Sequence, residues 1–211
     1  MAHLPNLSVV AVSPNRQDLC SDLPKILSSL LEGGIRGFMM REKSLPNDEF
    51  LRLGKELRAL CDHHNATFIL NERWELAEPM GARVVHLTWQ SKPMDMSQDK
   101  GDLLVGRSIH SVEECEPHQI LGLDYLVAGP VFPTPSKAGL VHDLGLGGIG
   151  KICEVSSVPV VAIGGIESDN VRQVVGTGVH GVAGISCFFA ADDPKAAAIK
   201  FCKAGELFGD D

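Results

Sequence analysis

The sequence has no excess of positive charge and no long apolar run. Asp and Glu number 27 against 19 Lys and Arg, which gives a formal net charge of −8. A negative chain offers no general attraction to a nucleic acid backbone. No segment approaches the roughly 18 consecutive apolar residues that cross a membrane, and the N-terminus carries no basic targeting segment. We therefore expect a cytoplasmic protein that binds neither nucleic acid nor a membrane.

The sequence also lacks closely spaced cysteines. It contains six cysteines, and no two of them lie within four residues of each other. A zinc site or a redox-active dithiol requires paired spacing, so the pattern argues against both. We expect free thiols, as is usual in the cytoplasm.

The composition is that of one folded domain. Of the 211 residues, 44% are hydrophobic and 22% are charged, which is close to the average of soluble globular proteins. No linker divides the chain, and the most polar stretch, residues 91–101, is interpreted as a loop. Residues 1–211 are therefore predicted to form a single domain.

Short apolar runs recur along the chain and alternate with helix-like segments. Apolar residues at helical spacing predict helices over residues 22–31 and 47–64. Runs that are apolar throughout are typical of strands buried on both faces, and their alternation with helices predicts a parallel sheet. The eight runs cover residues 7–12, 36–40, 67–70, 83–87, 103–106, 125–128, 159–163 and 181–184.

Eight such units predict an α/β protein with a single closed (β/α)8 TIM barrel. An open, doubly wound sheet is the competing architecture, but no Gly-x-Gly-x-x-Gly turn follows the first strand. In a barrel, the active site lies at the carboxyl ends of the strands. The residues directly after each run are therefore the candidates for function.

Glycines follow or end the last two predicted strands. Gly164 and Gly165 come after strand seven, and Gly184 ends strand eight before Ile185 and Ser186. Without a Cβ atom, glycine lets backbone N–H groups approach an anion, and the start of a following helix adds a favourable dipole. The pattern predicts a phosphate site at the ends of strands seven and eight, although Gly164-Gly165 also fits a simple tight turn.

Cations and hydroxyl groups follow other strands. Arg41 and Lys43 come directly after strand two, where they suit a second anion, although a solvated charged loop is the alternative. We expect phosphorylated small molecules as ligands.

The further candidates are Asn71, Glu72 and Arg73 after strand three, Ser108 near strand five, and Thr134, Ser136 and Lys137 in the proline-rich segment 129–137. Two of them have a structural alternative, because Asn71 also fits a helix cap and Arg73 also fits a surface residue.

In this order, the motifs resemble those of the thiamine phosphate synthase and thiazole tautomerase superfamily. The resemblance runs from strand two to strand eight and is most specific in segment 129–137 taken with the last two motifs. Residues 106–111 look more like the tautomerase branch. The motifs are Arg41-Glu42-Lys43, Asn71-Glu72-Arg73, Val85-His86-Leu87, segment 129–137, Ala162-Ile163-Gly164-Gly165-Ile166 and Gly184-Ile185-Ser186.

Resemblance to the synthases implies a transferase that joins hydroxymethylpyrimidine pyrophosphate to thiazole phosphate. A pyrimidine carbocation forms as pyrophosphate leaves, and the thiazole nitrogen captures it, so the step depends on stabilising the charge of the leaving group. By motif position, the resemblance implies catalytic roles for Arg41, Lys43 and Lys137, and Mg²⁺ binding by Glu72. It implies substrate binding by Asn71, Ser108, Thr134, Ser136, Gly165, Ile185 and Ser186.

The sequence departs from the synthase pattern near strands two, three and four. Met39 stands where the synthases have a glutamine that helps to hold the pyrimidine, and Glu72 stands where they have an aspartate for Mg²⁺. The second Mg²⁺ aspartate, which follows the Val-His-Leu motif in the synthases, is missing here. Asp95 on the same segment is a candidate substitute.

Two other functions stay open. A thiazole tautomerase needs a base and no metal, and its characterised members have a histidine where this chain has Pro130. His86 and His110 are the strand-end candidates for that base, although each also fits a structural histidine. The third interpretation is a non-catalytic barrel that binds thiazole phosphate. A homodimer is compatible with all three functions.

Overall fold

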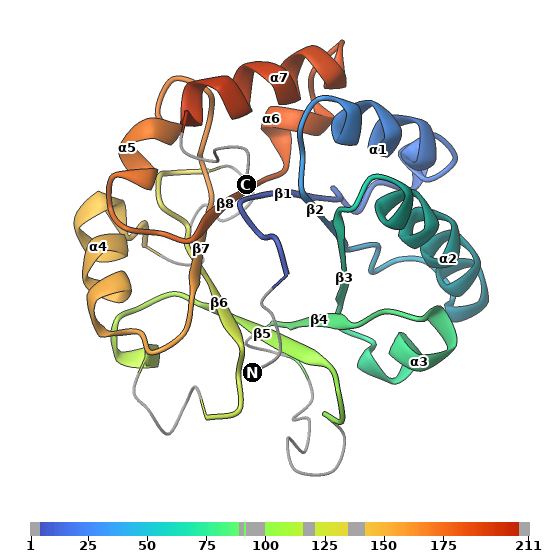
Figure 1. The fold of residues 1–211 in the computed structure, drawn as a ribbon, viewed down its shortest axis with the longest axis horizontal. Coiled ribbons are helices and arrows are strands. Elements are labelled where there is room, and N and C mark those ends of the chain that lie inside the picture. The colour runs from blue at the N-terminus through green and yellow to red at the C-terminus, as the bar shows by residue number, and fades with distance from the viewer. Residues whose placement is uncertain (1–4, 89–90, 92–99, 116–120, 135–141, 207–211) are drawn as a thin grey trace.

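Eight strands pair in chain order, and the last returns to pair with the first. Every pairing is parallel, so the sheet closes into a barrel (Figure 1). The structure is a computed structural model and describes residues 5–88, 91, 100–115, 121–134 and 142–206. It confirms the predicted (β/α)8 barrel. The strands are β1 (Val9–Val12), β2 (Gly37–Met40), β3 (Thr67–Asn71), β4 (Val84–Leu87), β5 (Leu104–Ile109), β6 (Tyr125–Ala128), β7 (Val160–Ile163) and β8 (Gly181–Gly184).

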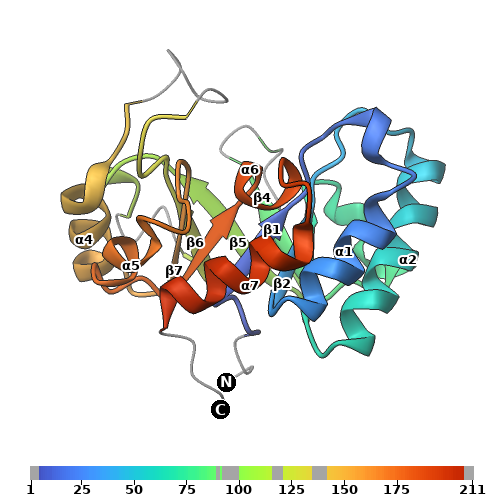
Figure 2. The same ribbon diagram turned by 90° about the horizontal axis from the view of Figure 1, so that it is seen from above.

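Helices surround the barrel on the outside (Figure 1, Figure 2). The two helices that the sequence predicts are confirmed, with ends that differ by at most one residue. No helix in the described part of the chain is long and apolar enough to cross a membrane. The α-helices are α1 (Leu23–Glu32), α2 (Asn47–His63), α3 (Ala77–Met80), α4 (Gly145–Val155), α5 (Val171–Val175), α6 (Ser186–Phe189) and α7 (Pro194–Gly205), and the short 3-10 helices are η1 (Gln17–Leu19), η2 (Trp74–Leu76) and η3 (Glu113–Cys115).

Leucine spacing explains α1. Leu23, Leu27 and Leu30 recur three or four residues apart and are all buried, which is the pattern of a helix with one face against a core. Pro24 lies in the first turn, where its missing N–H group leaves no helical hydrogen bond unmade. Gly34, with a φ of 106°, then turns the chain toward β2.

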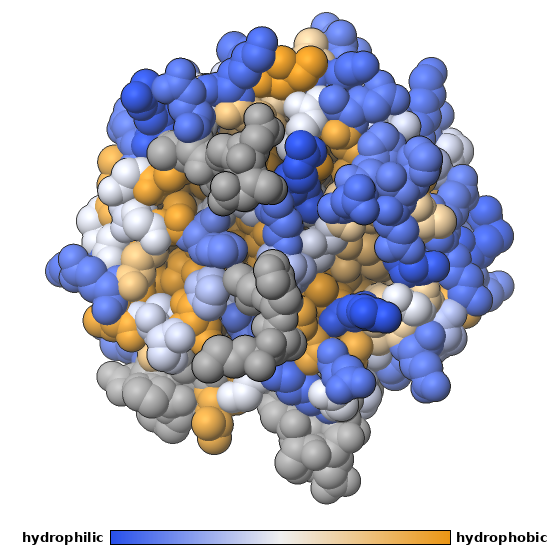
Figure 3. Space-filling view, viewed as in Figure 1, coloured by the Kyte–Doolittle hydropathy of each residue, from blue (hydrophilic) through white to orange (hydrophobic). Residues whose placement is uncertain are grey.

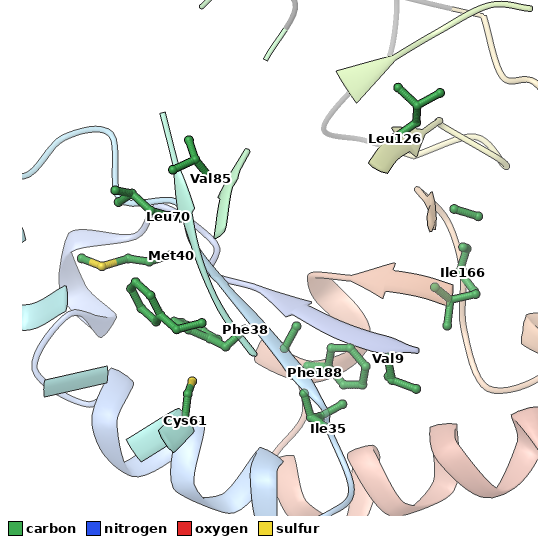
Figure 4. Packing of buried hydrophobic residues seen from close by; sticks show 14 of the residues in the cluster. Val9, Ile35, Phe38, Met40, Cys61, Leu70, Val85, Leu126, Ile166 and Phe188 are labelled. Carbon is green, nitrogen blue, oxygen red and sulfur yellow. The ribbon is translucent and has the colours of Figure 1, made fainter. Parts of the chain in front are cut away.

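The main core lies between the barrel and the helices. Phe38 and Met40 of β2 and Leu70 of β3 point away from the barrel axis, and Cys61 of α2 lies on the same side (Figure 4). All four side chains are at most 1% exposed. Residues two apart along a strand share a face, so this half of each strand holds its covering helix.

The other half of each strand fills the barrel interior. Val10, Met39, Ile69 and Tyr125 belong to this inner cluster. Gly106 makes room for the Tyr125 ring, because a Cβ atom at residue 106 would lie 2.1 Å from Tyr125 Cζ. The interior is therefore packed with side chains, and the ends of the barrel are left for ligands.

Two strand boundaries differ from the prediction by more than one residue. β1 begins at Val9, two residues later than expected, and β5 continues to Ile109, three residues beyond the predicted end. Polarity at Arg107 and Ser108 suggested the earlier end. Both residues nevertheless pair with β6, and Ser108 has a hydrogen-bond partner in His86 of β4. The ladder pairs the backbone of both residues and His86 pairs the Ser108 hydroxyl, so the strand continues.

The distribution of hydrophilic side chains and the state of the cysteines are as the sequence predicts. On the face that Figure 3 shows, hydrophilic side chains lie over α1 and α2, whereas hydrophobic ones are more frequent closer to the barrel. This is the distribution expected of helices that turn one apolar face inward. All six cysteines are free, and two of them are buried.

Truncation of Phe38 tests the outer core. Phe38 is fully buried between β2 and α2, so we expect Phe38→Ala to lower the free energy of unfolding by about 3–5 kcal/mol. The control is Val155→Ala on α4, where the side chain is 55% exposed and the change should stay within about 0.5 kcal/mol. Urea unfolding measures both variants. Equal effects would contradict the described packing.

Candidate active site

The carboxyl ends of the strands meet at one end of the barrel, toward which β6 and β7 point in Figure 2. The candidate residues gather there because each lies at or just after the end of a strand. Ser136 and Lys137, like Asp95, lie outside the described residues. The structure places Arg41 and Lys43 after β2, Asn71 at the end of β3 with Glu72 behind it, Ser108 near the end of β5, Thr134 after β6, Gly165 after β7, and Ile185 and Ser186 after β8.

Asn71, His86 and Ser108 form a polar cluster contributed by the neighbouring strands β3, β4 and β5. His86 Nε2 lies 2.9 Å from Ser108 Oγ, and Asn71 Nδ2 donates to the His86 carbonyl oxygen over 3.4 Å. Among the described residues, Asn71 Oδ1 and His86 Nδ1 have no hydrogen-bond partner, although both atoms are buried. An unpaired buried polar atom costs about 1–3 kcal/mol. A bound ligand that pairs with these atoms would recover that energy.

His86 is a neutral histidine. Burial lowers its pKa to about 3, because the charged imidazolium would lose its hydration inside the barrel. Its ring lies beside that of the buried Tyr125, with 5.8 Å between the ring centroids. A histidine in this state can orient a hydroxyl group such as that of Ser108, but it is a weak base.

Glu72 is held at the mouth of the barrel. Its backbone has a φ of 56°, and its N–H group donates to the His86 carbonyl oxygen over 2.9 Å. One carboxylate oxygen, Oε1, accepts hydrogen bonds from Thr88 Oγ1 at 2.6 Å and from Ser91 Oγ at 3.4 Å. Oxygen donors of this kind suit a hard cation such as Mg²⁺.

Arg73 is a half-buried residue that bridges two loops, through contacts that the sequence did not reveal. Its Nη2 donates to the carbonyl oxygens of Lys43 at 3.0 Å and of Leu45 at 2.8 Å. The guanidinium also lies over the Phe50 ring, with Cζ 4.3 Å from the ring centroid. The strained backbone of Arg73, with a φ of 45°, is held by these contacts. Arg73 thereby ties the loop after β3 to the loop after β2.

Arg41 and Lys43 combine a fixed backbone with free side chains. The Arg41 N–H group donates to Ser13 Oγ at 2.8 Å, and that of Lys43 donates to Asn15 Oδ1 at 2.7 Å. Arg41 is half-buried and Lys43 is exposed. Neither side chain forms a hydrogen bond or an ion pair with the described part of the protein. Two uncommitted cations at a barrel end are suited to an anionic ligand.

Glu42, between these cations, is a functional candidate that the sequence did not reveal. Its side chain is only 2% exposed. Oε1 accepts from the Asn15 N–H group at 3.1 Å, and Oε2 accepts from Cys20 Sγ at 3.7 Å. Burial, together with the nearby Glu42 carboxylate, raises the pKa of Cys20 to about 11. Buried carboxylates are rare unless they are paired, but a charged triplet after a strand does not show which member is buried.

Gly164 and Gly165 allow the loops after β6 and β7 to pack together. Their φ values are 103° and 67°, and added Cβ atoms would lie 2.6 Å from Pro130 Cβ and 2.7 Å from Phe132 Cβ. The N–H groups of Val131 and Phe132 donate to Ile163 and Gly164 carbonyl oxygens, each over 3.0 Å. Gly164 and Gly165 therefore form a tight turn. Because neither residue has a side chain, their backbone is uncovered by Cβ atoms at the mouth of the barrel.

The segment after β8 completes this side of the mouth. Ile185 precedes α6, and Ser186 is the first and exposed residue of that four-residue helix. A side chain on Gly184, at the end of β8, would force Cys187 to move, because its Cβ atom would lie 2.2 Å from Cys187 Sγ. The two glycine-containing motifs thus lie at the ends of the neighbouring strands β7 and β8.

His110, the second histidine singled out from the sequence, lies just after β5. Its Nδ1 is in hydrogen-bond contact with the carbonyl oxygen of Gly129. Its Nε2 is buried and has no partner among the residues that the structure describes. Pro130, the next residue after Gly129, offers no titratable group at this point of the site.

Residues 5–88, 91, 100–115, 121–134 and 142–206 contain no group of three or more His, Cys, Asp or Glu side chains that could hold a metal ion. Glu72 therefore belongs to no such group, and its carboxylate is supported by the hydroxyl groups of Thr88 and Ser91. Mg²⁺ accepts such a site, because it usually keeps several water molecules and takes further oxygens from a substrate phosphate.

Taken together, the fold and the mouth define a (β/α)8 barrel whose functional residues are presented by the strand ends. The chain belongs to the thiamine monophosphate synthase family, whose sequence profile matches residues 9–188.

Named relatives agree with this assignment. The chain is 39% identical over 177 residues to the thiamine-phosphate synthase of Pyrococcus furiosus, covering 83% of this chain and 85% of that protein. It is 39% identical over 168 residues to the thiamine-phosphate synthase of Archaeoglobus fulgidus, covering 80% of each. The solved structure of thiamine phosphate pyrophosphorylase from Pyrococcus furiosus superimposes with a TM-score of 0.86 at 34% identity, over 97% of this chain and 98% of that one.

Substitution of Gly164 tests the packing of the two glycine-dependent loops. Gly164→Ala adds a Cβ atom at a φ of 103° and against Pro130, so we expect a loss of at least about 2 kcal/mol in the free energy of unfolding. Gly150→Ala in α4, where nothing lies within 4 Å of the added atom, should instead stabilise the protein by up to about 1 kcal/mol. Denaturant unfolding compares them, and a neutral Gly164→Ala would refute the close approach.

The buried neutral His86 predicts a pH dependence of stability. Below the ordinary pKa of 6.5, the unfolded chain binds a proton at residue 86 that the folded protein does not bind until about pH 3. Stability due to this site is therefore lost as the pH falls from 6.5 toward 3, by up to about 1.4 kcal/mol per pH unit. His86→Gln should flatten the measured slope of unfolding free energy against pH, whereas His63→Gln at an exposed site should not. Identical slopes in all three proteins would rule out a buried neutral His86.

Proposed function

We propose that this protein is a thiamine-phosphate synthase. It would join hydroxymethylpyrimidine pyrophosphate to thiazole phosphate, giving thiamine phosphate and free pyrophosphate. The proposal is supported by membership of the thiamine monophosphate synthase family. The single structural observation that carries it is the pair of cations, Arg41 and Lys43, which lie on a fixed backbone at the end of β2 and whose side chains have no hydrogen-bond or ion-pair partner among the described residues.

In this proposal the site has two halves. The half built on β2, β3, β5 and β6 binds the pyrophosphate of the first substrate, and the half built on β7 and β8 binds the phosphate of the second. Glycines in the second half let backbone N–H groups reach phosphate oxygens. The first half consists of Arg41, Lys43, Asn71, Ser108, Thr134, Ser136 and Lys137, and the second of Gly165, Ile185 and Ser186.

The reaction requires charge stabilisation more than a base. The bond between the pyrimidine methylene carbon and the pyrophosphate oxygen breaks, and the oxygen keeps the electron pair. The thiazole nitrogen then supplies its lone pair to the carbocation to form the new carbon–nitrogen bond. Preorganised cations such as Arg41 and Lys43 favour the first step, because negative charge grows on the leaving group where they lie.

Glu72 is the proposed ligand for Mg²⁺. Its carboxylate is oriented by Thr88 and Ser91, and the neighbouring Asn71 presents an unpaired buried oxygen atom. A bound Mg²⁺ would neutralise charge on the pyrophosphate. The missing second aspartate means that water and substrate oxygens would complete the coordination shell.

The tautomerase alternative is less well supported by the geometry. That reaction needs a base, and Pro130 occupies the position of the tautomerase histidine. His86 is a weak base because burial lowers its pKa to about 3. A cytoplasmic location and a homodimer stay predictions from the sequence.

The proposal is tested by measuring thiamine phosphate formation from the two substrates, with and without Mg²⁺. We expect Mg²⁺-dependent product from the unmodified protein, and a loss of roughly 10²–10³-fold in kcat/KM for Arg41→Met. Arg52→Met, which changes an exposed arginine on α2, is the matched control and should retain full activity.

Each contrary result points to a different function. Absence of product, with thiazole phosphate still bound in calorimetry, would refute the synthase and leave the tautomerase or the non-catalytic barrel. Turnover of a thiazole carboxylate phosphate would then identify the tautomerase. Product formation that Arg41→Met leaves unchanged would refute the role given to the residues after β2.

A further inference from the structure

Glu42 is an unusual neighbour for two residues that are proposed to bind an anion. A carboxylate between Arg41 and Lys43 would oppose anion binding if it faced the ligand. Its oxygens instead accept hydrogen bonds from the N–H group of Asn15 and the thiol of Cys20, both in the segment after β1. With 2% of the residue exposed, the Glu42 carboxylate is shielded from solvent and bonded to the segment after β1.

Asn15 returns the contact. Its side-chain oxygen, Oδ1, accepts from the N–H group of Lys43 at 2.7 Å and from that of Ser44 at 3.3 Å. Its backbone has a φ of 58°, a conformation that asparagine tolerates better than most residues. Asn15 and Glu42 therefore form a reciprocal clamp. The Glu42 side chain accepts from the N–H group of Asn15, and the Asn15 side chain accepts from the N–H groups of the two residues after Glu42.

Two further residues, Ser13 and Arg73, also hold the backbone of the loop after β2. Ser13, which is fully buried, accepts from the Arg41 N–H group at 2.8 Å. Arg73 donates to the carbonyl oxygen of Lys43 at 3.0 Å. The two backbone polar groups of Lys43 are thus held from opposite neighbours, the N–H group by the loop after β1 and the carbonyl group by the loop after β3.

We propose that Glu42 is a positioning residue, which fixes the β2 loop through its clamp with Asn15 so that Arg41 and Lys43 meet the pyrophosphate. This inference rests on the proposed function. Glu42 does not touch the substrate itself. Its contribution is preorganisation, because a loop already held in the binding conformation loses less conformational freedom when the ligand arrives.

The chemistry of the clamp indicates which substitutions preserve it. Both bonds to Glu42 use its oxygens as acceptors, and the one to Asn15 requires only a single oxygen at Oε1. Glu42→Gln keeps that oxygen, whereas Glu42→Ala removes it. At Asn15, glycine keeps the positive φ but removes the acceptor for Lys43, so Asn15→Gly breaks the clamp from its other side without straining the backbone.

The experiment compares Glu42→Ala, Glu42→Gln, Asn15→Gly and the control Glu49→Ala, an exposed carboxylate on α2. Steady-state kinetics give KM for each substrate, and calorimetry gives the Kd of inorganic pyrophosphate with Mg²⁺ present. A displacement of about 1 Å in a positioned group can cost on the order of 10²-fold. For Glu42→Ala and Asn15→Gly we therefore expect the pyrimidine KM and the pyrophosphate Kd to rise roughly 10–100-fold.

The same variants should leave KM for thiazole phosphate unchanged, because in the described part of the chain no hydrogen bond of Asn15 or Glu42 involves the residues after β7 or β8. Glu42→Gln should restore most of the pyrophosphate affinity, and Glu49→Ala should equal the unmodified protein. A merely structural role predicts a different result, in which thermal stability falls while both substrates keep their KM values.

Two outcomes overturn the inference: a pyrophosphate Kd within about twofold of the unmodified protein in Glu42→Ala, or an equal rise in KM for both substrates. If Glu42→Ala does not fold, Asn15→Gly decides by the same criteria. Failure of the proposed function is recognised separately, since an unmodified protein that binds pyrophosphate but forms no product refutes the synthase while the Kd comparison still tests the clamp. An unmodified protein that does not bind pyrophosphate refutes both.

Discussion

Closure of the parallel hydrogen-bond ladder is the constraint on which the rest of the structure depends. Because all strands run in one direction and β8 pairs with β1, their carboxyl ends form a single ring. Residues far apart in the chain, such as Arg41 and Gly165, therefore lie at the same end of the barrel. The interior beneath them is filled by side chains such as Tyr125, so chemistry is confined to this ring.

The loops on the ring are held mainly by bonds between neighbours. Ser13 binds the backbone of Arg41, Arg73 binds the carbonyl oxygen of Lys43, and Val131 after β6 binds the end of β7. The bond from Phe132 to Gly164 joins the loop after β6 to the loop after β7, so side chains and backbone groups from one loop satisfy the backbone of the next. The backbone of the cations after β2 is held in place, which lowers the entropy cost of binding an anion.

Much of the fold follows from local pattern. Strands that are buried on both faces consist of apolar residues throughout, so all eight were found from short runs, and the leucines of α1 marked its buried face. β5 ended too early in the prediction, because Arg107 and Ser108 are polar and their partners lie on other strands. The bridging contacts of Arg73 were missed for the same reason, since its acceptors belong to the loop after β2.

The sequence by itself determined the order of strands and helices, the closed barrel, the family and the kinds of side chain that end each strand. These depend on the local periodicity of apolar residues and on motifs within a few positions of one another. Only the tertiary structure decided that His86 is neutral, that Glu42 is buried and that Gly164 admits no side chain. Each of these properties depends on atoms of neighbouring strands and loops, which only chain closure brings into contact.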